Sequence, residues 1–229
     1  MSKIEENLSQ LRARIFRACE KVKRNPQDVK IVAVTKNVSV EKIKQAIDCG
    51  IEIVGENKVQ EAQTKYGQID KKVSWHLVGH LQTNKVKKAL EIFEMIQSVD
   101  SLKLAEEIDK RAKEKNDVLP VLIEVNTSDE ATKYGVKPEL TEQVIREIRK
   151  LENIKIKGLM TMAPLIDDKE KVRQSFRNLR KTYEKMKNLK VPNLELEYLS
   201  MGMSSDFEEA IEEGSNMLRI GTAIFGPRS

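Results

Sequence analysis

The sequence predicts one α/β domain over residues 1–229, a (β/α)₈ TIM barrel with an N-terminal helix. Eight short, mostly branched apolar runs alternate with amphipathic segments of helical period, and no change of composition divides the chain. Its length is slightly below the ~250 residues typical of such barrels. With 39% hydrophobic, 34% charged and 4% aromatic residues, the composition excludes disordered and fibrous classes.

The first element is a helix, because Ile4, Leu8, Leu11 and Ile15 recur at helical spacing. The first strand is expected at residues 31–36, whose sequence IVAVTK is almost continuously apolar. Such runs are typical of strands that are covered on both faces, as in parallel sheets.

The same alternation continues to the end of the chain. Pro120 weakens the strand preference at the start of the fifth run, because proline cannot donate a ladder hydrogen bond. The longest helical stripe lies in the segment that precedes the seventh run. The further strands are expected at residues 51–57, 74–80, 93–100, 118–126, 154–162, 194–202 and 216–226.

The chain reaches Ser229 directly after the eighth run, which leaves no room for a final helix. We therefore expect the N-terminal helix to cover the surface that an eighth helix would occupy. The alternative architecture is an open doubly wound sheet, which also alternates strands and helices. No GxGxxG motif follows the first strand, which disfavours that alternative.

Charge and cysteine content indicate a cytoplasmic protein. Lys and Arg total 41 against 36 Asp and Glu, and this net charge of +5 is spread along the chain without the basic stripe that nucleic-acid binding needs. Cys19 and Cys49 have no CxxC spacing, which favours a reducing compartment. No apolar run resembles a signal peptide or a membrane span, and no broad apolar surface is evident, so we expect a monomer without membrane contact.

In TIM barrels the functional residues lie at the carboxyl ends of the strands. Here these positions are Lys36, Glu56, Asn57, His80, Asn126, residues 200–206 and residues 221–226. A lysine such as Lys36, placed among apolar neighbours, can act as an amine nucleophile when its pKa is lowered. The simpler reading is that Lys36 only marks the place where the strand meets water.

The strongest signal lies in residues 200–211 and 219–226, which follow or form strands seven and eight. The loops after these strands commonly bind phosphate in such barrels. Gly202 and Gly221 would allow close backbone approach to an anion, and Ser204, Ser205 and Thr222 would supply hydroxyl donors.

Ser205 and Glu208 match the S-x-x-E capping box, which would direct a short helix's N-terminus toward the same point. The simpler interpretation is a capped helix beside glycine turns, with no ligand.

Other motifs are weak. His76 and His80 lack the glutamate of HExxH and any third ligand nearby, so packing or hydrogen bonding is the favoured role. There is no P-loop. Met160 and Met162 are expected to fill the barrel interior. The spacing of Glu61, Glu124 and Glu208 indicates no acid–base pair, and most glutamates are expected to face solvent.

Taken together, six motifs resemble the YggS/PROSC family of pyridoxal phosphate homeostasis proteins over essentially the whole chain. They are AVTK at Lys36, GENKVQE from Gly55, WHLVGHLQTNK from Trp75, GLMTMAP from Gly158, LSMGMSSDFEEAI from Leu199 and RIGTAIFG from Arg219. Two positions, Asn37 and His80, carry proline in some members.

The resemblance implies a barrel like the N-terminal domain of alanine racemases, with pyridoxal 5′-phosphate (PLP) held as a Schiff base on Lys36. It implies that Arg219 faces the pyridine nitrogen and that Asn57 lines the pocket. It places the phosphate near Ser200, Gly202, Ser204, Gly221 and Thr222.

These assignments favour a carrier that buffers or delivers PLP with little or no turnover, and PLP-dependent apo-enzymes are the expected recipients. PLP is the stronger electron sink when its ring nitrogen is protonated, and the always-charged Arg219 cannot accept that proton. Racemases also use a tyrosine base from a further domain, and among the tyrosines here only Tyr134 is expected near the barrel mouth. The alternatives are a PLP-dependent amino-acid racemase and a phosphate-binding barrel enzyme without PLP.

Overall fold

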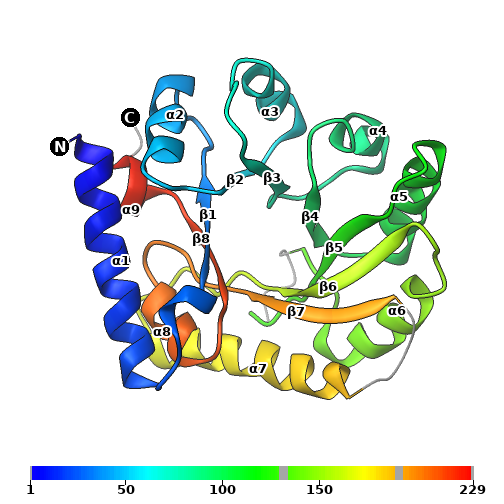
Figure 1. The fold of residues 1–229 in the computed structure, drawn as a ribbon. Coiled ribbons are helices and arrows are strands. Elements are labelled where there is room, and N and C mark those ends of the chain that lie inside the picture. Colours follow the sequence, from blue (N-terminus) through cyan, green and yellow to red (C-terminus); the bar gives the residue numbers. More distant parts are fainter. Residues whose placement is uncertain (1, 129–133, 189–192, 228–229) are drawn as a thin grey trace.

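The protein is described by a computed structural model that covers residues 2–128, 134–188 and 193–227. Within these residues, eight parallel strands follow one another around a closed barrel, and the last pairs with the first (Figure 1). The strands are β1 (Lys30–Val34), β2 (Ile53–Glu56), β3 (Ser74–Leu77), β4 (Met95–Val99), β5 (Leu119–Glu124), β6 (Ile154–Met160), β7 (Leu194–Ser200) and β8 (Met217–Ile220). The α-helices are α1 (Lys3–Lys21), α2 (Val40–Asp48), α3 (Val59–Tyr66), α4 (Val86–Ala89), α5 (Leu102–Glu114), α6 (Thr141–Ile148), α7 (Lys169–Lys187), α8 (Phe207–Glu212) and α9 (Thr222–Phe225). Three 3₁₀ turns are Pro26–Asp28, Thr83–Lys85 and Pro138–Leu140.

The apolar strands are buried on both faces. Val32 packs in the barrel interior with Met160 and Met217, whereas its neighbour Ala33 belongs to the larger core between the barrel and the helices. Successive strand residues point to opposite faces, so a strand between two cores needs apolar side chains at nearly every position. This is why the sequence shows continuous apolar runs, and Met160 fills the interior as expected.

Helix α1 occupies the position that the sequence predicts for it. Ser2 and Glu5 form a capping box at its start, and Leu8 and Leu11 are among the residues it buries. The helix packs against α8, α9 and α2 (Figure 1). Asn7 Nδ2 also donates a hydrogen bond of 2.9 Å to the Ile224 carbonyl oxygen in α9. The first helix therefore covers the outside of the barrel where its last strand closes.

Two local expectations are wrong. The eighth run is a strand only over Met217–Ile220, and residues 222–225 form α9 because the chain turns at Gly221, whose carbonyl accepts from Ile224 and Phe225. The Ser205–Glu208 capping box does not form. Helix α8 begins one residue later than that box requires, its N-cap is Asp206, and the Asp206 carboxylate instead accepts from the Met203 amide.

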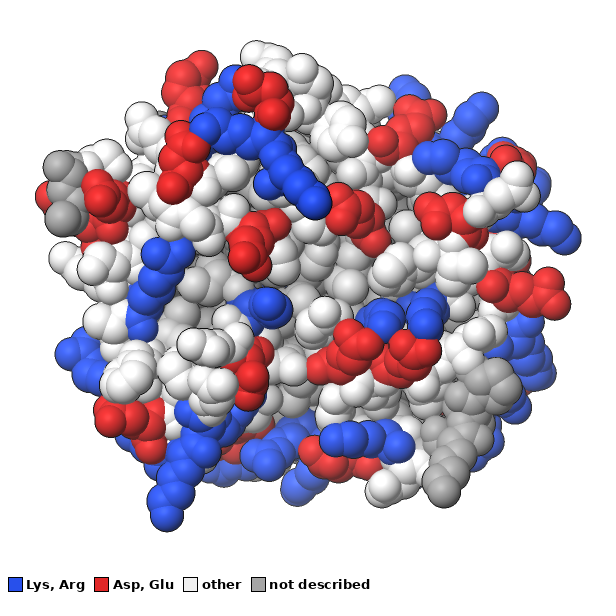
Figure 2. Space-filling model, in the orientation of Figure 1, with Lys and Arg blue, Asp and Glu red and all other residues white. Residues whose placement is uncertain are grey.

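The described surface carries mixed charge. Figure 2 shows Lys and Arg side chains interspersed with Asp and Glu over one face of the molecule. Cys19 and Cys49 are both free thiols. None of the helices in the described part of the chain has the length and apolar character that crossing a membrane requires.

Candidate functional site

A cavity of about 340 Å³ lies at the carboxyl ends of the strands. It brings together six of the eight residues predicted for the site, and two others lie beneath it. The lining residues are Val34, Lys36, Asn57, Val78, Met162, Leu165, Met203, Ser204, Ser205, Arg219, Gly221 and Thr222. Ser200 and Gly202 do not line this cavity.

The amine and amide side of the cavity comes from β1 and β2. Lys36 lies two residues beyond β1 and is partly buried, and Asn57 directly follows β2. The Asn57 Oδ1 atom is buried without a hydrogen-bond partner among the described residues. Since a buried amide oxygen without a partner is costly, Asn57 is suited to accept a hydrogen bond from a ligand in this cavity.

Gly79 makes the position of Asn57 possible, although the sequence analysis did not select it. A Cβ atom at residue 79 would lie 2.4 Å from the Asn57 carbonyl oxygen and 2.8 Å from its Cα. Only glycine allows the backbone after β3 to approach the backbone after β2 this closely. The glycine of the WHLVGH motif was the available signal.

The opposite side of the cavity comes from the chain after β7 and β8. The Ser204 hydroxyl oxygen accepts a hydrogen bond of 3.1 Å from the Ala223 amide in α9. Its hydroxyl proton remains available to donate into the cavity. The amides of Ser204 and Thr222 donate to no other described residue. Hydroxyl and amide donors of this kind suit a phosphate group.

Gly202 shapes this segment from below. Its φ is +96°, and a Cβ atom there would lie 2.6 Å from the Ala210 side chain. Glycine is therefore required at this position in the turn between β7 and α8. The turn places Met203, Ser204 and Ser205 at the cavity.

Arg219 forms the floor of the cavity and is held by two hydrogen bonds. Its Nη1 donates to Ser200 Oγ at 2.7 Å, and its Nη2 donates to the Thr161 carbonyl at 2.6 Å. Burial lowers the pKa of Arg219 to about 10, while Glu124 and Asp206 oppose that effect. The guanidinium is therefore protonated at neutral pH and has no capacity to take up a proton from a ligand.

Ser200 is fully buried and continues a polar chain through the barrel interior. Its hydroxyl donates to Gln97 Oε1 at 2.7 Å, and Gln97 Nε2 lies 2.9 Å from His76 Nδ1. Burial lowers the pKa of His76 to about 4, so the imidazole is neutral and accepts this bond at Nδ1. The expected hydrogen-bonding role of His76 is confirmed, and Ser200 orients Arg219 from below the cavity.

His80 also has a structural role. Its Nδ1 lies 3.1 Å from Asp100 Oδ2, and its ring stacks on Tyr134 with 3.7 Å between the centroids. Tyr134 thus lies beside the segment after β3, as the sequence predicts for a residue near the mouth, but it does not line the cavity.

Glu124 departs from the expectation that glutamates face solvent, because only 3% of it is exposed. Burial raises the pKa of Glu124 to about 7, the Asp100 carboxylate adds to the increase, and Arg219 opposes it. The folded protein therefore binds a proton at Glu124 over a pH range in which the unfolded chain has released it.

Glu124→Gln is expected to stabilise the protein at pH 8 and to change its stability little at pH 4.5. Because the pKa of Glu124 is raised in the folded state, ionisation of this carboxyl lowers the free energy of unfolding as the pH rises from 4.5 to 7. The shift in pKa corresponds to a loss of about 3 kcal/mol in the free energy of unfolding at high pH. Glutamine has no charge to bury, so the variant does not suffer this loss. Urea denaturation at both pH values measures the difference, with Glu20→Gln on α1 as the control. An equal effect of Glu124→Gln at both pH values would contradict the assignment.

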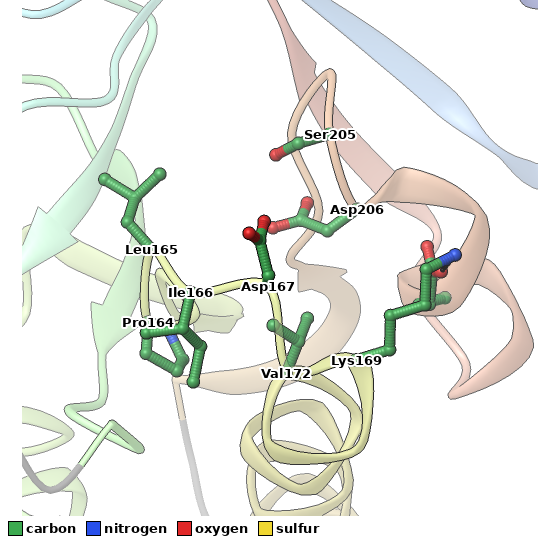
Figure 3. A pocket seen from close by; sticks show the side chains of 9 residues that line it. Pro164, Leu165, Ile166, Asp167, Lys169, Val172, Ser205 and Asp206 are labelled. Carbon is green, nitrogen blue, oxygen red and sulfur yellow. Dashed lines mark ion pairs between the residues drawn. The ribbon is translucent and has the colours of Figure 1, made fainter.

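A larger cavity of about 430 Å³ lies beside the first, between the loop after β6 and the start of α8. Figure 3 shows Asp167 and Asp206 pointing toward each other across it. Glu209 adds a third carboxylate, and Lys169 pairs with it at 3.0 Å. This excess of negative charge disfavours a phosphate, so the cavity that contains Lys36 and Arg219 is the better candidate.

The residues that the sequence analysis missed are mainly apolar. Met162 packs against the interior cluster, as expected of a filler, but it also lines the cavity with Val34 and Val78. Leu165 is 85% exposed at the rim. Val34 precedes Lys36 by two residues, and in an extended chain residues two apart point to the same side. This alternation was the signal that could have identified Val34 as a lining residue.

The family model of the alanine racemase N-terminal domain matches residues 3–229. A pyridoxal phosphate homeostasis protein of Aquifex aeolicus is 44% identical over 224 residues, which cover 97% of each chain. The protein with the same name in Escherichia coli is 35% identical over 233 residues, which cover 100% of this chain and 98% of the relative.

Solved structures give the same result. PipY of Synechococcus elongatus with PLP bound has a TM-score of 0.85 and 33% identity, covering 98% of this chain and 100% of that chain. An alanine racemase of Clostridium difficile has a TM-score of 0.80 at 18% identity and shares the fold over 60% of its own chain. The cavity, the barrel and these similarities agree, and the chain belongs to the family of pyridoxal phosphate homeostasis proteins.

Proposed function

We propose that this protein binds PLP through Lys36 and acts in PLP homeostasis, buffering or delivering the cofactor with little or no turnover. The observation that carries the proposal is one cavity that holds a lysine amine, a phosphate-type donor set and a buried arginine. The names of the relatives and the PLP bound to PipY support it.

The residues of the cavity fit PLP. Lys36 would hold PLP through its amine, which can bond to the aldehyde carbon with loss of water. The hydroxyls of Ser204 and Thr222 and nearby amides would hold the phosphate, together with Gly221. Asn57 Oδ1 would gain the hydrogen bond that it lacks. Ser200 and Gly202 would act from beneath the cavity, by holding Arg219 and by shaping the turn.

The surroundings of Arg219 support a carrier over an enzyme. When bound, PLP supplies an electron sink whose strength depends on a protonated ring nitrogen. The guanidinium is already protonated and cannot accept a further proton, and it donates hydrogen bonds to Ser200 and Thr161. No tyrosine lines the cavity within the described residues, so the second base of a racemase has no counterpart there.

Incubation of the PLP-loaded protein with L-alanine tests the choice between carrier and racemase. We expect no D-alanine above the amount formed by a Lys36→Ala control. If D-alanine forms and its formation depends on Lys36, the protein is a racemase and the proposal of a carrier is wrong.

We further propose that the chain works as a single cytoplasmic domain, as a monomer, with PLP-dependent apo-enzymes as recipients. Mixing the PLP-loaded protein with such an apo-enzyme is expected to restore the activity of the apo-enzyme faster than spontaneous release of PLP allows. Equal rates would mean that PLP passes through solution.

Ser204→Ala and Thr222→Ala are each expected to weaken PLP retention by about 1–3 kcal/mol, the range for a hydrogen bond to a charged group. Equilibrium dialysis of the two variants measures the change. Thr182→Ala is a suitable control, because that hydroxyl bonds within α7 to the Asn178 carbonyl. Unchanged affinity in both cavity variants would contradict the placement of the phosphate.

A further inference from the structure

The segment that carries Lys36 lies beyond the end of β1, where the sheet no longer fixes the backbone. The Thr35 amide makes the last hydrogen bond to β2, at 2.9 Å from the Gly55 carbonyl oxygen. Asn37 follows with a φ of +59°, a left-handed conformation that residues other than glycine adopt at some cost. The path of the chain through Lys36 therefore needs support from outside the strand.

Two charged residues of α3 provide that support. Lys65 Nζ donates to the Thr35 carbonyl oxygen at 2.7 Å, on the N-terminal side of Lys36. Glu61 Oε1 accepts from the Asn37 amide at 2.6 Å, on the C-terminal side. The same Glu61 oxygen lies 2.7 Å from Lys65 Nζ, so the two contacts are joined.

The network is anchored deeper in the barrel wall by Glu56. Lys65 donates its third hydrogen bond to Glu56 Oε1 at 2.8 Å, and the Thr35 hydroxyl donates to the same oxygen at 2.6 Å. All three protons of the Lys65 ammonium are thereby used. Glu56 is fully buried and the Lys65 side chain is 10% exposed, so the charges are fixed in place.

Burial alone would raise the pKa of Glu61, but hydrogen bonds from Lys65 and the Asn37 amide lower it below its ordinary value. The positive charge of Lys36 itself adds to this effect. Buried ion pairs of this kind often add little stability compared with apolar side chains of equal volume, because both charges lose their hydration. A role in holding a particular loop conformation explains their presence better than a role in general stability.

We propose that Lys65 and Glu61 are positioning residues, which clamp the backbone on both sides of Lys36 and thereby direct its ε-amine into the cavity. The inference rests on the proposed function, since it assigns these residues to the condensation of Lys36 with the aldehyde of PLP. In that condensation the amine nitrogen bonds to the aldehyde carbon, and water leaves.

Two probes separate positioning from binding. PLP reports the condensation rate by its absorbance change, with borohydride reduction and peptide mass spectrometry to identify the modified lysine. Pyridoxine 5′-phosphate has an alcohol in place of the aldehyde, so its affinity reports the cavity alone. The variants are Lys65→Met, Glu61→Ala and Glu61→Gln, and thermal melting shows which of them are folded.

We expect condensation to be ~10- to 100-fold slower in Lys65→Met and Glu61→Ala, because misplacement of a reacting group by about 1 Å has effects of this size. Affinity for pyridoxine phosphate should change less than about 3-fold, or less than 1 kcal/mol. Glu61→Gln keeps an oxygen that accepts from the Asn37 amide, so it should recover most of the rate.

Lys157→Met is the matched control. Lys157 also pairs with two glutamates, Glu195 and Glu197, but lies on β6 away from the cavity. We expect Lys157→Met to react with PLP at the wild-type rate.

Wild-type rates in Glu61→Ala would overturn the proposal even if Lys65→Met does not fold. Equal losses for both probes in Glu61→Ala would also overturn it, because that result indicates a damaged cavity. A wild-type protein that forms no adduct with PLP would refute the proposed function instead.

Discussion

Lys36→Ala is expected to eliminate covalent retention of PLP. The cavity contains one lysine among its described lining residues, and under the proposed function that lysine would supply the amine. Without it, the donors after β7 and β8 would still hold the phosphate, so weak non-covalent binding should remain. Borohydride reduction followed by peptide mass spectrometry should find the pyridoxyl group on Lys36 in the wild type and no adduct in the variant.

Lys42→Ala is the control for this experiment. Lys42 lies in α2 and lines a neighbouring cavity together with Lys36, so it tests whether any amine near the site is labelled. We expect its replacement to leave the adduct unchanged. A Lys36→Ala protein that still carries a reducible adduct would show that another amine binds the aldehyde.

Gly158→Ala is expected to have the largest effect on stability. Gly158 lies in β6 opposite Tyr198 of β7, and a Cβ atom at residue 158 would lie 1.9 Å from the Tyr198 carbonyl oxygen. The clash involves backbone on both sides, so the two strands would have to separate. We expect a loss of more than ~3 kcal/mol, at the upper end of the cost of overpacking. Urea denaturation and the yield of soluble protein measure it.

Gly67→Ala is the matched control for the stability experiment. Gly67 ends α3 with a φ of −69°, and apart from its own chain neighbours no described residue has an atom within 4 Å of the position its Cβ would take. Alanine fits there and restricts the unfolded chain, so a gain of about 0.4–1 kcal/mol is expected. Similar stabilities of the Gly158→Ala and Gly67→Ala proteins would contradict the clash.

The barrel could be predicted from sequence because the interior cluster and the larger core between the barrel and the helices require apolar side chains in most strands. The strand ends were less predictable. The run from Gly221 to Phe225 contains apolar residues, as a strand does, yet it forms α9, because the pairing of β8 with β1 ends at Ala33 and Ile220. Apolar composition indicates burial and leaves the local backbone conformation open.

The residues at the cavity could be predicted where a polar side chain follows a strand, as with Lys36 and Asn57. The residues that hold the Lys36 segment in place could not be predicted. Lys65 and Glu61 have the i, i+4 spacing of an ordinary solvated helix pair. Only the three-dimensional structure shows that Lys65 is buried and that both side chains bond to the backbone on either side of Lys36. The pattern at Ser205 and Glu208 was misleading, because Asp206 starts the helix one residue later.

The closure of the barrel has a consequence for the way the protein is made. Lys36 follows β1 and Thr222 follows β8, and these two strands are neighbours in the barrel although they are far apart in the sequence. The hydrogen bond from Asn7 to Ile224 joins residues at a similar separation. A nascent polypeptide on the ribosome contains Lys36 long before Ser204 and Thr222 are translated. Under the proposed function, cofactor capture would therefore begin only when translation has delivered the last strand.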